Sequence, residues 1–230
     1  MSIRLAIVGM GKMGKAIEQL AGERGCEVVA RLDVPETSKG ITATMLNGAE
    51  VAVEFTTPGS AAANVRGLIA AGIPTVVGTT GWYDHLPDIS ADVKKRNGAL
   101  LTATNFSLGV NAFETILAQA AAILAATGSF DAHMVELHHA AKKDAPSGTA
   151  HTLAKAASAA WGREIPITSV RTGSIPGSHE VIFDAPFETI RIAHVARDRR
   201  VFAEGAIVAA KWLVGKKGVF TMKDVIALSS

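Results

Sequence analysis

The sequence predicts an α/β protein in two parts: a doubly wound parallel sheet at the amino-terminal end, and a smaller α+β domain with a mixed or antiparallel sheet. Two observations support this prediction. In the first half, short apolar runs alternate with segments of helical periodicity, which is the pattern of parallel strands joined by crossover helices. In the second half, two helical segments are followed by short β-type runs with turns between them.

Five apolar runs are the expected strands of the parallel sheet. Each combines aliphatic or β-branched residues with a turn-forming end, and together they cover residues 3–8, 27–33, 50–55, 73–78 and 98–104. Helical periodicity follows the first and the third of these runs. The ordered succession of strand and helix is stronger evidence than any single run.

The second half changes character after about residue 107. Residues 110–128 form a long helical pattern, whose apolar stripe comprises Phe113, Ile116, Leu117, Ala120, Ile123 and Leu124. Residues 130–139 then predict a strand, and residues 145–162 predict a helix with Ser147 at its N-cap. Four β-type runs follow, at residues 167–173, 177–186, 187–196 and 200–205. The closing residues 203–228 predict a helix of about four turns, a glycine break and a short tail.

Composition limits the possible functions. The 230 residues are 48% hydrophobic and 19% charged, which indicates a globular chain. The formal charge of +2 is too balanced for the basic face that nucleic-acid binding requires, so we expect no nucleic-acid partner. The single cysteine, Cys26, suits a reducing compartment, and the amino-terminal apolar stretch is too short to span a membrane. We therefore expect a cytoplasmic protein with no membrane partner.

A glycine-rich turn follows the first expected strand. It matches the pattern G-x-G-x-x-G of Rossmann-type domains and comprises Gly9, Met10, Gly11, Lys12, Met13 and Gly14. Such glycines let the backbone approach a pyrophosphate at a helix N-terminus. Asp33 lies 19 positions after Gly14, at the end of the second strand, where a carboxylate can bind a ribose diol. Strand, turn, helix and acid together predict dinucleotide binding, with a structural glycine turn as the alternative.

Three later turns are expected to border the same ligand. They are rich in Gly and Thr and lie at residues 56–60, 78–82 and 103–111, at the carboxyl ends of successive strands. In open α/β sheets the ligand lies along that edge. The pattern predicts a dinucleotide-binding domain over residues 1–107, with residues 200–230 packing back on it, and a substrate-binding and oligomerisation domain over residues 108–199.

The stretch "HHAAKKDAPSGTA", residues 138–150, combines proton carriers with a helix start. Adjacent histidines at the end of a strand point to opposite sides, so one of them faces a given cavity. Ser147, Gly148 and Thr149 offer a hydroxyl and the amide N–H groups of a helix start to an anion. The stretch predicts a site for an anionic substrate beside a proton donor, unless the histidines are structural and the lysines belong to a solvated loop.

Other chemistries are less consistent with this stretch. Adjacent histidines point apart and have no cysteine or H-x-x-x-H companion, so we expect no metal site. Ser147 does not lie in a G-x-S-x-G elbow, which argues against a serine nucleophile. Lys142 could form a Schiff base, but the nucleotide fold favours hydride chemistry.

The stretch "ELHHAAKKDAPSGTA" is similar to the signature E-x-H-H-x-x-K-x-D-A-P-S-G-T-A of the 4-hydroxy-tetrahydrodipicolinate reductases, formerly called dihydrodipicolinate reductases. The resemblance extends along the chain to "GKMG", "EFTTP", "GTTGW", "NFSLGVN", "RTGSIPGSHEVIF" and "FAEGAIVAAKWL". It implies an NAD(P)H-dependent reduction of a cyclic dicarboxylate imine in lysine and diaminopimelate synthesis, and a homotetramer built through the sheet of the second domain.

Site roles follow from this resemblance by position. It implies that His138 is the proton donor or acceptor and Lys142 a second proton donor, while His139, Gly148 and Thr149 hold the substrate. The residues that would line the dinucleotide are Gly9 to Met13, Asp33, Gly78, Thr79, Thr80, Ala103, Thr104, Asn105 and Phe106.

The cofactor is expected to be NADH or NADPH, with a lean toward NADH. Family members often place an Arg after the acidic residue, whereas this chain has Val34, and Asp33 repels a 2′-phosphate. Lys39 or Arg31 could restore NADPH use. Two other functions remain open on the sequence alone: a related Rossmann-type aspartate or sugar dehydrogenase, and a non-enzymatic NAD(P)H sensor.

Overall fold

The computed structural model describes residues 2–34 and 36–227, and the chain divides into two compact units. The first unit contains residues 1–108 and 200–230, and the second contains residues 109–199. Each unit has its own sheet and its own hydrophobic core. The second unit is thus an insertion between two segments of the first.

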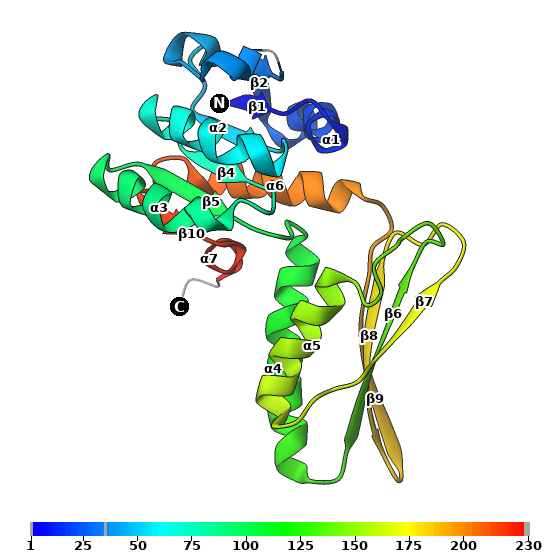
Figure 1. Ribbon diagram of the computed structural model, residues 1–230. Coiled ribbons are helices and arrows are strands. Elements are labelled where there is room, and N and C mark those ends of the chain that lie inside the picture. Colours follow the sequence, from blue (N-terminus) through cyan, green and yellow to red (C-terminus); the bar gives the residue numbers. More distant parts are fainter. Residues whose placement is uncertain (1, 35, 228–230) are drawn as a thin grey trace. The chain divides into compact units, whose positions relative to one another are not determined.

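The sheet of the first unit is parallel throughout (Figure 1). Its strands, in the order in which they lie side by side, are β10 (Gly218–Phe220), β5 (Ala99–Thr102), β4 (Thr75–Val77), β3 (Val51–Glu54), β1 (Ile3–Val8) and β2 (Cys26–Leu32). The five predicted strands are all present. β10 was not predicted, because its three residues are too few for a periodic signal.

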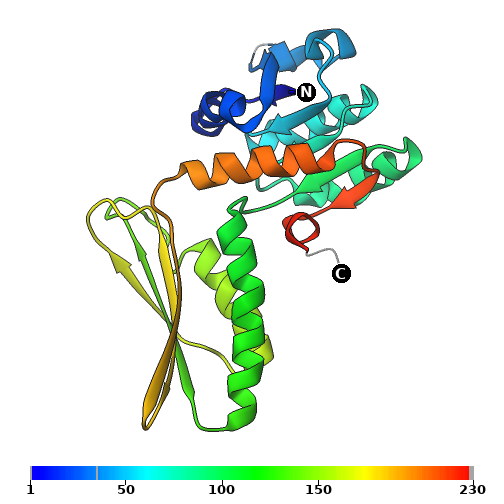
Figure 2. The same cartoon turned by 180° about the vertical axis from the view of Figure 1, so that it is seen from behind.

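Helices cover both faces of this sheet, as a doubly wound fold requires. The α-helices of this unit are α1 (Lys12–Ala21), α2 (Pro58–Ala70), α3 (Leu86–Lys95), α6 (Arg200–Leu213) and α7 (Met222–Ile226). Short 3-10 turns lie at Gly22–Arg24, Glu36–Lys39, Ala43–Leu46 and Tyr83–His85. α1 and α6 pack on one face, and α2 and α3 pack on the other (Figures 1 and 2).

Side chains alternate between the two faces along each strand. On β1, Leu5 and Ile7 point into the core beneath α1 and α6, whereas Ala6 and Val8 point into the core on the α2 side. Both sets are completely buried. This accounts for the continuous apolar run in the sequence, since a strand covered on both faces has no solvent side.

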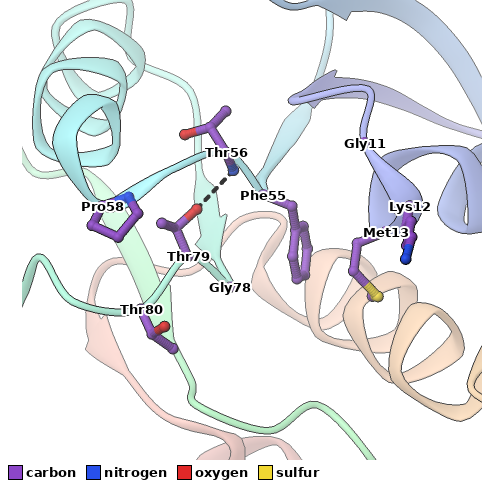
Figure 3. Close-up of a pocket in the computed structure, with 9 residues that line it drawn as sticks. All are labelled: Gly11, Lys12, Met13, Phe55, Thr56, Pro58, Gly78, Thr79 and Thr80. Atoms are coloured by element: carbon purple, nitrogen blue, oxygen red, sulfur yellow. Dashed lines mark hydrogen bonds between the residues drawn. The ribbon is translucent and has the colours of Figure 1, made fainter. Parts of the chain in front are cut away.

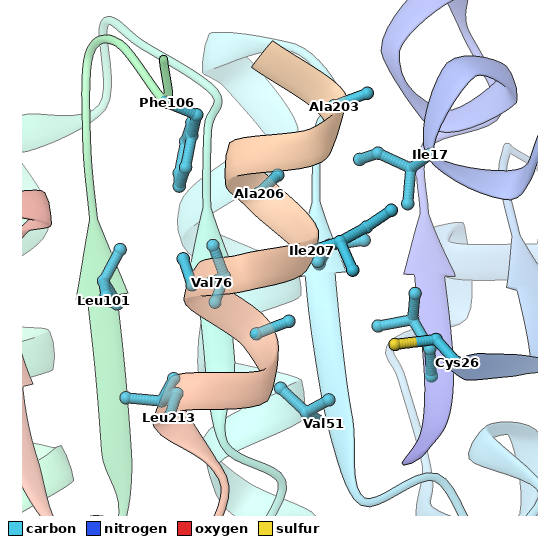
Figure 4. Close-up of a cluster of buried hydrophobic side chains, with 14 of the residues drawn as sticks. Ile17, Cys26, Val51, Val76, Leu101, Phe106, Ala203, Ala206, Ile207 and Leu213 are labelled. Carbon is cyan, nitrogen blue, oxygen red and sulfur yellow. The ribbon is translucent and has the colours of Figure 1, made fainter. Parts of the chain in front are cut away.

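Helix α6 closes the core of the first unit (Figure 4). Its small residues Ala203, Ala206 and Ala210 are completely buried, together with Ile207 and Leu213. The prediction of a β-type run over residues 200–205 is wrong, because these residues form the first turns of α6. The apolar residues at positions 201 and 202 resemble a strand only until the helical spacing of the following alanines is included.

The second unit is a four-stranded mixed sheet with helices on one face (Figure 1). Its strands lie in the order β7 (Ile167–Arg171), β6 (Asp131–His138), β8 (Ser178–Ala185) and β9 (Glu188–Val195), and its helices are α4 (Leu108–Thr127) and α5 (Gly148–Trp161). β6 and β7 are parallel, while the other two pairs are antiparallel. The predicted mixed sheet is therefore confirmed.

Helix α4 differs from the predicted apolar stripe. Phe113, Leu117 and Leu124 pack into the core with α5 and the sheet, but Ile116 and Ile123 are 52% and 67% exposed. By length and composition this helix could cross a membrane. The core against which one side of α4 packs accounts for much of its apolar character.

Candidate active site

The glycine turn between β1 and α1 passes close to the end of β3. Gly9 has a φ of +97°, and a Cβ there would stand 2.1 Å from the carbonyl oxygen of Phe55. A Cβ on Gly14 would stand 2.0 Å from the carbonyl oxygen of Gly9. Both positions therefore admit only glycine. The turn lies where the order of the strands reverses, between β1 and β3, which is the ligand-binding edge of such sheets.

Gly11 differs from the other two glycines of the turn. It is the N-cap of α1, and apart from its chain neighbours no atom of the described residues lies within 4 Å of the position that its Cβ would occupy. No side chain of residues 2–34 and 36–227 caps this helix, so the first N–H groups of α1 are left for another acceptor. Open space next to uncapped amides fits the pyrophosphate of a dinucleotide.

A cavity of about 420 Å³ opens beside this turn (Figure 3). Its lining residues come from the ends of β1, β3 and β4 and are Gly11, Lys12, Met13, Phe55, Thr56, Pro58, Gly78, Thr79 and Thr80. The amide of Thr56 donates to the hydroxyl of Thr79 at 2.7 Å, which ties two of the turns together (Figure 3). A Cβ on Gly78 would collide with the ring of Phe55, so close packing of these turns requires glycine there.

Polar groups beneath the cavity hold these turns. The Glu54 carboxylate is completely buried and accepts hydrogen bonds from the hydroxyl of Thr56 and the side-chain amide of Asn64. Burial raises the pKa of Glu54, although these hydrogen bonds oppose it. Trp82 donates its indole N–H to the carbonyl of Thr79 at 2.7 Å. Sequence analysis gave no role to Glu54 or Asn64, and it placed Trp82 only within a turn that borders the ligand, because no motif identifies their hydrogen bonds.

Asp33 lies after β2 and contacts the glycine turn. One carboxylate oxygen accepts from the amide of Met10 at 3.3 Å, and the other accepts from the amide of Val34 at 3.0 Å. The Glu36 carboxylate accepts from the backbone amide of Asp33 at 3.2 Å, so a second acidic residue lies next to Asp33. Arg31 pairs with Glu18 at 2.5 Å.

The turn after β5 completes this edge of the sheet. Ala103 donates its amide to the carbonyl of Val77 at 3.3 Å, and Thr104 follows it in the chain. Asn105 accepts from the amide of Ser107 at 2.9 Å. The ring of Phe106 is buried and lies 5.5 Å from that of Phe55. The predicted dinucleotide residues thus occupy neighbouring strand ends within the first unit.

In the second unit, β6 places His138 on the same side as Glu136, two residues earlier. Both are buried, whereas His139 lies beyond the strand and is half-buried. Glu136 and His138 therefore share one face of the strand. Nδ1 of His138 forms a hydrogen bond with Oε2 of Glu136. The imidazole is therefore oriented by a carboxylate that belongs to the quoted signature but to which sequence analysis gave no role.

Arg171, at the end of β7, holds the other oxygen of Glu136. Its Nη2 donates to Oε1 of Glu136 at 2.6 Å and to the carbonyl oxygen of Asp144 at 2.6 Å. Burial favours a raised pKa for Glu136, but the hydrogen bonds from Arg171 and His138 outweigh it, so this pKa is lowered. Glu136 is thus an ionised carboxylate in a buried position.

Burial also shifts the protonation equilibria of the buried histidines His138 and His179. It lowers the pKa of His138, while the hydrogen bond with Glu136 raises it in part and the cations Lys142 and Arg171 lower it further. His179 on β8 lies 5.3 Å from His138, ring to ring. Burial, followed by the charge of His138, lowers the pKa of His179 to about 4, so His179 is neutral at neutral pH.

The loop from β6 to α5 contains the remaining predicted residues. Lys142 donates to the Asp144 carboxylate at 2.8 Å, and Lys143 is exposed. Ser147 is the N-cap of α5, as predicted, and its buried hydroxyl accepts from the amide of Ala150 at 3.1 Å. The same hydroxyl lies 3.3 Å from Nε2 of His179. Gly148 and Thr149 begin the helix, with their amides in its first turn.

The structure thereby links residues that are distant in the sequence. His138 packs beside His179, which contacts Ser147, and Arg171 connects Glu136 to the backbone of the loop that contains Lys142. Ligand atoms of Glu136, His138 and His179 lie within 4.8 Å of one another. Since the guanidinium of Arg171 already neutralises Glu136, we interpret this cluster as a hydrogen-bonded proton-handling network and not as a metal site.

Sequence analysis missed Glu136, Arg171 and His179. Glu136 precedes His138 by two residues, and the alternation of side chains in a strand was sufficient to place both on one face. Arg171 and His179 reach the cluster through strand pairing, because Arg171 is opposite His138 on β7 and His179 is opposite Glu136 on β8. No local sequence signal specifies those registers.

A dinucleotide cradle on one unit and a buried histidine–carboxylate network on the other define the class of the protein: a two-domain, pyridine-nucleotide-dependent oxidoreductase. Comparison with known families specifies this class further. The family model described as "Dihydrodipicolinate reductase, N-terminus" matches residues 3–106, and the one described as "Dihydrodipicolinate reductase, C-terminus" matches residues 109–226. The chain belongs to the dihydrodipicolinate reductase family.

Individual relatives agree with this assignment. The 4-hydroxy-tetrahydrodipicolinate reductase of Christiangramia forsetii is 36% identical over 237 residues, which cover 98% of each chain. The enzyme of the same name from Thiobacillus denitrificans is 34% identical over 269 residues, covering 99% of this chain and all of that one. The protein is therefore an NAD(P)H-dependent reductase acting on 4-hydroxy-tetrahydrodipicolinate in lysine and diaminopimelate biosynthesis.

Solved structures show the same fold. Dipicolinate-bound dihydrodipicolinate reductase from Paenisporosarcina sp. TG-14 aligns with a TM-score of 0.83 at 22% identity, covering 97% of this chain and 99% of that one. Aspartate dehydrogenase from Thermotoga maritima aligns with a TM-score of 0.53 at 10% identity, covering 94% of this chain and 98% of that one. Both likenesses concern the fold alone, and the family assignment sets aside the aspartate or sugar dehydrogenase and sensor alternatives.

Proposed function

We propose that His138 supplies the proton of the reduction and that Lys142 acts as a second proton donor. The observation that supports this most strongly is the buried His138 imidazole, oriented through Nδ1 by an ionised carboxylate. A histidine held in this way keeps Nε2 for a reacting group. Lys142 lies four residues later on the adjoining loop, where its partner Asp144 is exposed and can be replaced by an anionic substrate.

We propose that the loop and the start of α5 bind a small dicarboxylate. The amides of Gly148 and Thr149 lie in the first turn of a 14-residue helix, where a carboxylate gains hydrogen bonds and a favourable dipole. The hydroxyl of Ser147 already caps the helix, so Ser147 contributes by holding the cradle in shape. His139, half-buried at the end of β6, supplies a further contact. Unpaired carboxylates would otherwise cost several kcal/mol on leaving water.

We propose that the dinucleotide binds to the first unit, along the glycine turn and the following strand ends. The reduced nicotinamide supplies the hydride when it is bound. The residues assigned to this site are Gly9, Met10, Gly11, Lys12, Met13, Gly14, Asp33, Gly78, Thr79, Thr80, Ala103, Thr104, Asn105 and Phe106. The neighbouring carboxylates of Asp33 and Glu36 favour a ribose diol over a 2′-phosphate, and the pairing of Arg31 with Glu18 leaves Arg31 engaged elsewhere, so we propose a preference for NADH.

The proton roles can be tested by single substitutions. The substrate is generated from aspartate semialdehyde and pyruvate by the preceding synthase, and oxidation of NADH is followed by absorbance. We expect His138→Ala and Lys142→Ala each to lower kcat by about two orders of magnitude, the usual contribution of a general acid, while the Kd for NADH stays unchanged. Lys143→Ala, at an exposed neighbour, is the matched control. Near-normal turnover of either variant would contradict the assigned role.

We propose a cytoplasmic homotetramer assembled through the sheet of the second unit. α4 and α5 pack on the face that contains Met134, Val181 and Phe183, while Val135 and Ile182 lie half-buried on the opposite face. That face also carries His133, Glu180 and Arg191, and its half-buried aliphatic side chains favour pairing with another copy. Light scattering tests this: we expect a mass of four chains, and a lower mass for Ile182→Glu. A monomeric wild-type protein would contradict the proposal.

The single buried thiol, Cys26, agrees with a reducing compartment.

A further inference from the structure

We propose that Glu136 and Arg171 are positioning residues of the reduction: Glu136 fixes the ring and tautomer of His138, and Arg171 couples that carboxylate to the loop that binds substrate. This inference rests on the proposed role of His138 as proton donor. It adds two residues to the site to which sequence analysis gave no role, and it assigns them a function distinct from substrate contact. Three hydrogen bonds connect these residues in a chain. Arg171 donates to the carbonyl oxygen of Asp144 and to the Glu136 carboxylate, and Glu136 in turn is hydrogen-bonded to His138.

The contacts of Glu136 are divided between two partners. Its side chain is completely buried; Oε2 meets Nδ1 of His138, and Oε1 accepts from Arg171 at 2.6 Å. An ionised carboxylate only accepts hydrogen bonds, so the proton between Glu136 and His138 lies on Nδ1. Nε2 is then the nitrogen that exchanges a proton with the substrate. In the neutral ring Nε2 carries no proton, so the imidazolium is the form that donates a proton from Nε2, while Nδ1 keeps its hydrogen bond to Glu136.

The second nitrogen of His138 faces the backbone of Gly177. A Cβ at Gly177 would stand 3.1 Å from Nε2, closer than most real Cβ contacts. Gly177 lies in the segment between β7 and β8, immediately before β8. Thus Nδ1 is fully committed to Glu136, whereas the backbone next to Nε2 is the smallest that a protein can provide.

Arg171 connects this pair to the substrate loop. One nitrogen, Nη2, donates both to Glu136 and to the carbonyl of Asp144, while Nη1 donates to the carbonyl of Val170 at 2.8 Å. Asp144 lies between Lys142, which it pairs with, and Ser147, which begins the anion cradle. A planar guanidinium can hold both acceptors in fixed geometry, and an ammonium cannot reproduce this fork. The position of the cradle therefore depends on the same side chain that holds Glu136.

The charges that face His138 from the surrounding elements act in opposite directions. Among the described residues, Glu136 of β6 is the anion in direct contact, and it favours the protonated imidazole. Lys142 of the loop and Arg171 of β7 disfavour it, as does burial. His179 of β8 is neutral at neutral pH, and His194 of β9 acts on His179. Removing the charge of Glu136 must therefore lower the pKa of His138 further, because the opposing influences remain.

Titration of His138 tests the positioning role without requiring catalysis. Imidazole ¹⁵N chemical shifts of the ligand-free protein report the tautomer and the midpoint of protonation. We expect the wild-type protein to show the Nδ1–H tautomer, and Glu136→Gln to titrate at lower pH. Asp131→Asn is the matched control, since Asp131 is an exposed, arginine-paired carboxylate on the same strand. An unchanged His138 midpoint in Glu136→Gln would overturn the proposal.

Kinetics then separate this proposal from the proposed function. If protonated His138 is the donor, kcat/KM falls as pH rises through its pKa, and in Glu136→Gln this fall begins at lower pH. We expect kcat at neutral pH to decrease by roughly 10- to 100-fold, with the Kd for NADH unchanged. A shifted titration with an unshifted rate profile would refute His138 as the donor while leaving the Glu136 contact intact.

Arg171→Lys tests the second half of the proposal. This substitution retains a positive charge beside Glu136, so the buried carboxylate is not left unpaired. It removes the planar guanidinium that donates to two acceptors at once. We expect the KM for the dicarboxylate to rise by at least about tenfold, because the loop is no longer held, with little change in the Kd for NADH. Wild-type KM and kcat in Arg171→Lys, with a folded protein confirmed by circular dichroism, would remove Arg171 from the proposal.

Discussion

The carbonyl oxygen of Phe106 occupies the position where a side chain of Gly205 would begin. A Cβ at Gly205 would stand 1.7 Å from that oxygen, closer than any non-bonded contact allows. Gly205 lies in the second turn of α6, and Phe106 belongs to the turn after β5 that borders the proposed dinucleotide site. The backbone of α6 at Gly205 therefore limits how closely the Phe106 turn can approach this helix.

Gly205→Ala should destabilise the first unit, since either α6 or the Phe106 turn must move. We expect a loss of about 2 kcal/mol or more, which lowers Tm by roughly 5 °C. Gly22→Ala is the control: Gly22 is helical, and no atom lies within 4 Å of its Cβ position, so the substitution should be neutral or stabilising. Equal Tm values for the two variants would contradict the steric argument.

Gly11 and Gly14 should respond differently to substitution, although they belong to one motif. Gly11→Val places a side chain in open space, so the protein should fold normally but bind NADH at least about 100-fold more weakly. Gly14→Ala collides with the backbone of Gly9 and should lower Tm as well. Thermal denaturation and NADH fluorescence titration distinguish these outcomes. Normal NADH affinity in Gly11→Val would exclude Gly11 from the site.

The free energy of unfolding should depend on pH through His179. Its pKa is about 4 in the folded protein and near 6.5 when exposed, so the unfolded chain binds more protons between these values. Its contribution is complete above pH 6.5 and is lost as pH falls toward 4, amounting to at most about 3 kcal/mol. His138 and His194, whose pKa values are also lowered, act in the same direction.

Urea denaturation at several pH values checks this prediction. In His179→Gln the free energy of unfolding should fall less steeply between pH 6.5 and 4 than in the wild-type protein. His151→Gln, at an exposed position on α5, should leave the wild-type slope unchanged. A slope identical in all three proteins would show that His179 titrates normally.

Cofactor choice should change with one substitution at Val34. This side chain is 72% exposed next to Asp33, so an arginine there can reach a 2′-phosphate without disturbing the core. We expect Val34→Arg to raise kcat/KM for NADPH at least about tenfold, the effect of one charge-assisted hydrogen bond. Val34→Gln controls for size without charge. A wild-type enzyme that already prefers NADPH strongly would contradict the basis of this prediction.

The first unit was largely predictable because local signals determine it. β1, the glycine turn and α1 form a sequence-contiguous motif, and the buried strands appear as unbroken apolar runs. Helix α3 was missed, since residues 83–96 contain Pro and many charged residues. Residues 200–205 were wrongly predicted as a β-type run because their helical character depends on the alanines that follow.

Fewer features of the second unit could be predicted, because many of its contacts depend on residues that are distant in the sequence. Ser147 was correctly predicted as an N-cap, because capping depends on adjacent residues. Ile116 and Ile123 were assigned to the apolar stripe of α4, yet both are exposed, because periodicity alone does not specify which edge of a wide apolar face is covered. The partners of His138 could not be predicted, since strand register across β6, β7 and β8 brings them together.

Pairing of β10 with β5 has a consequence for synthesis of the chain on the ribosome. Residues 218–220 complete the sheet of the first unit, and α6 completes its core, but both are translated after the whole inserted unit. The inserted unit can therefore fold first, while the face of the first unit that α6 later covers remains exposed. Ribosome-stalled chains ending near residue 199 should expose that face to chaperones, and release should follow once α6 has emerged.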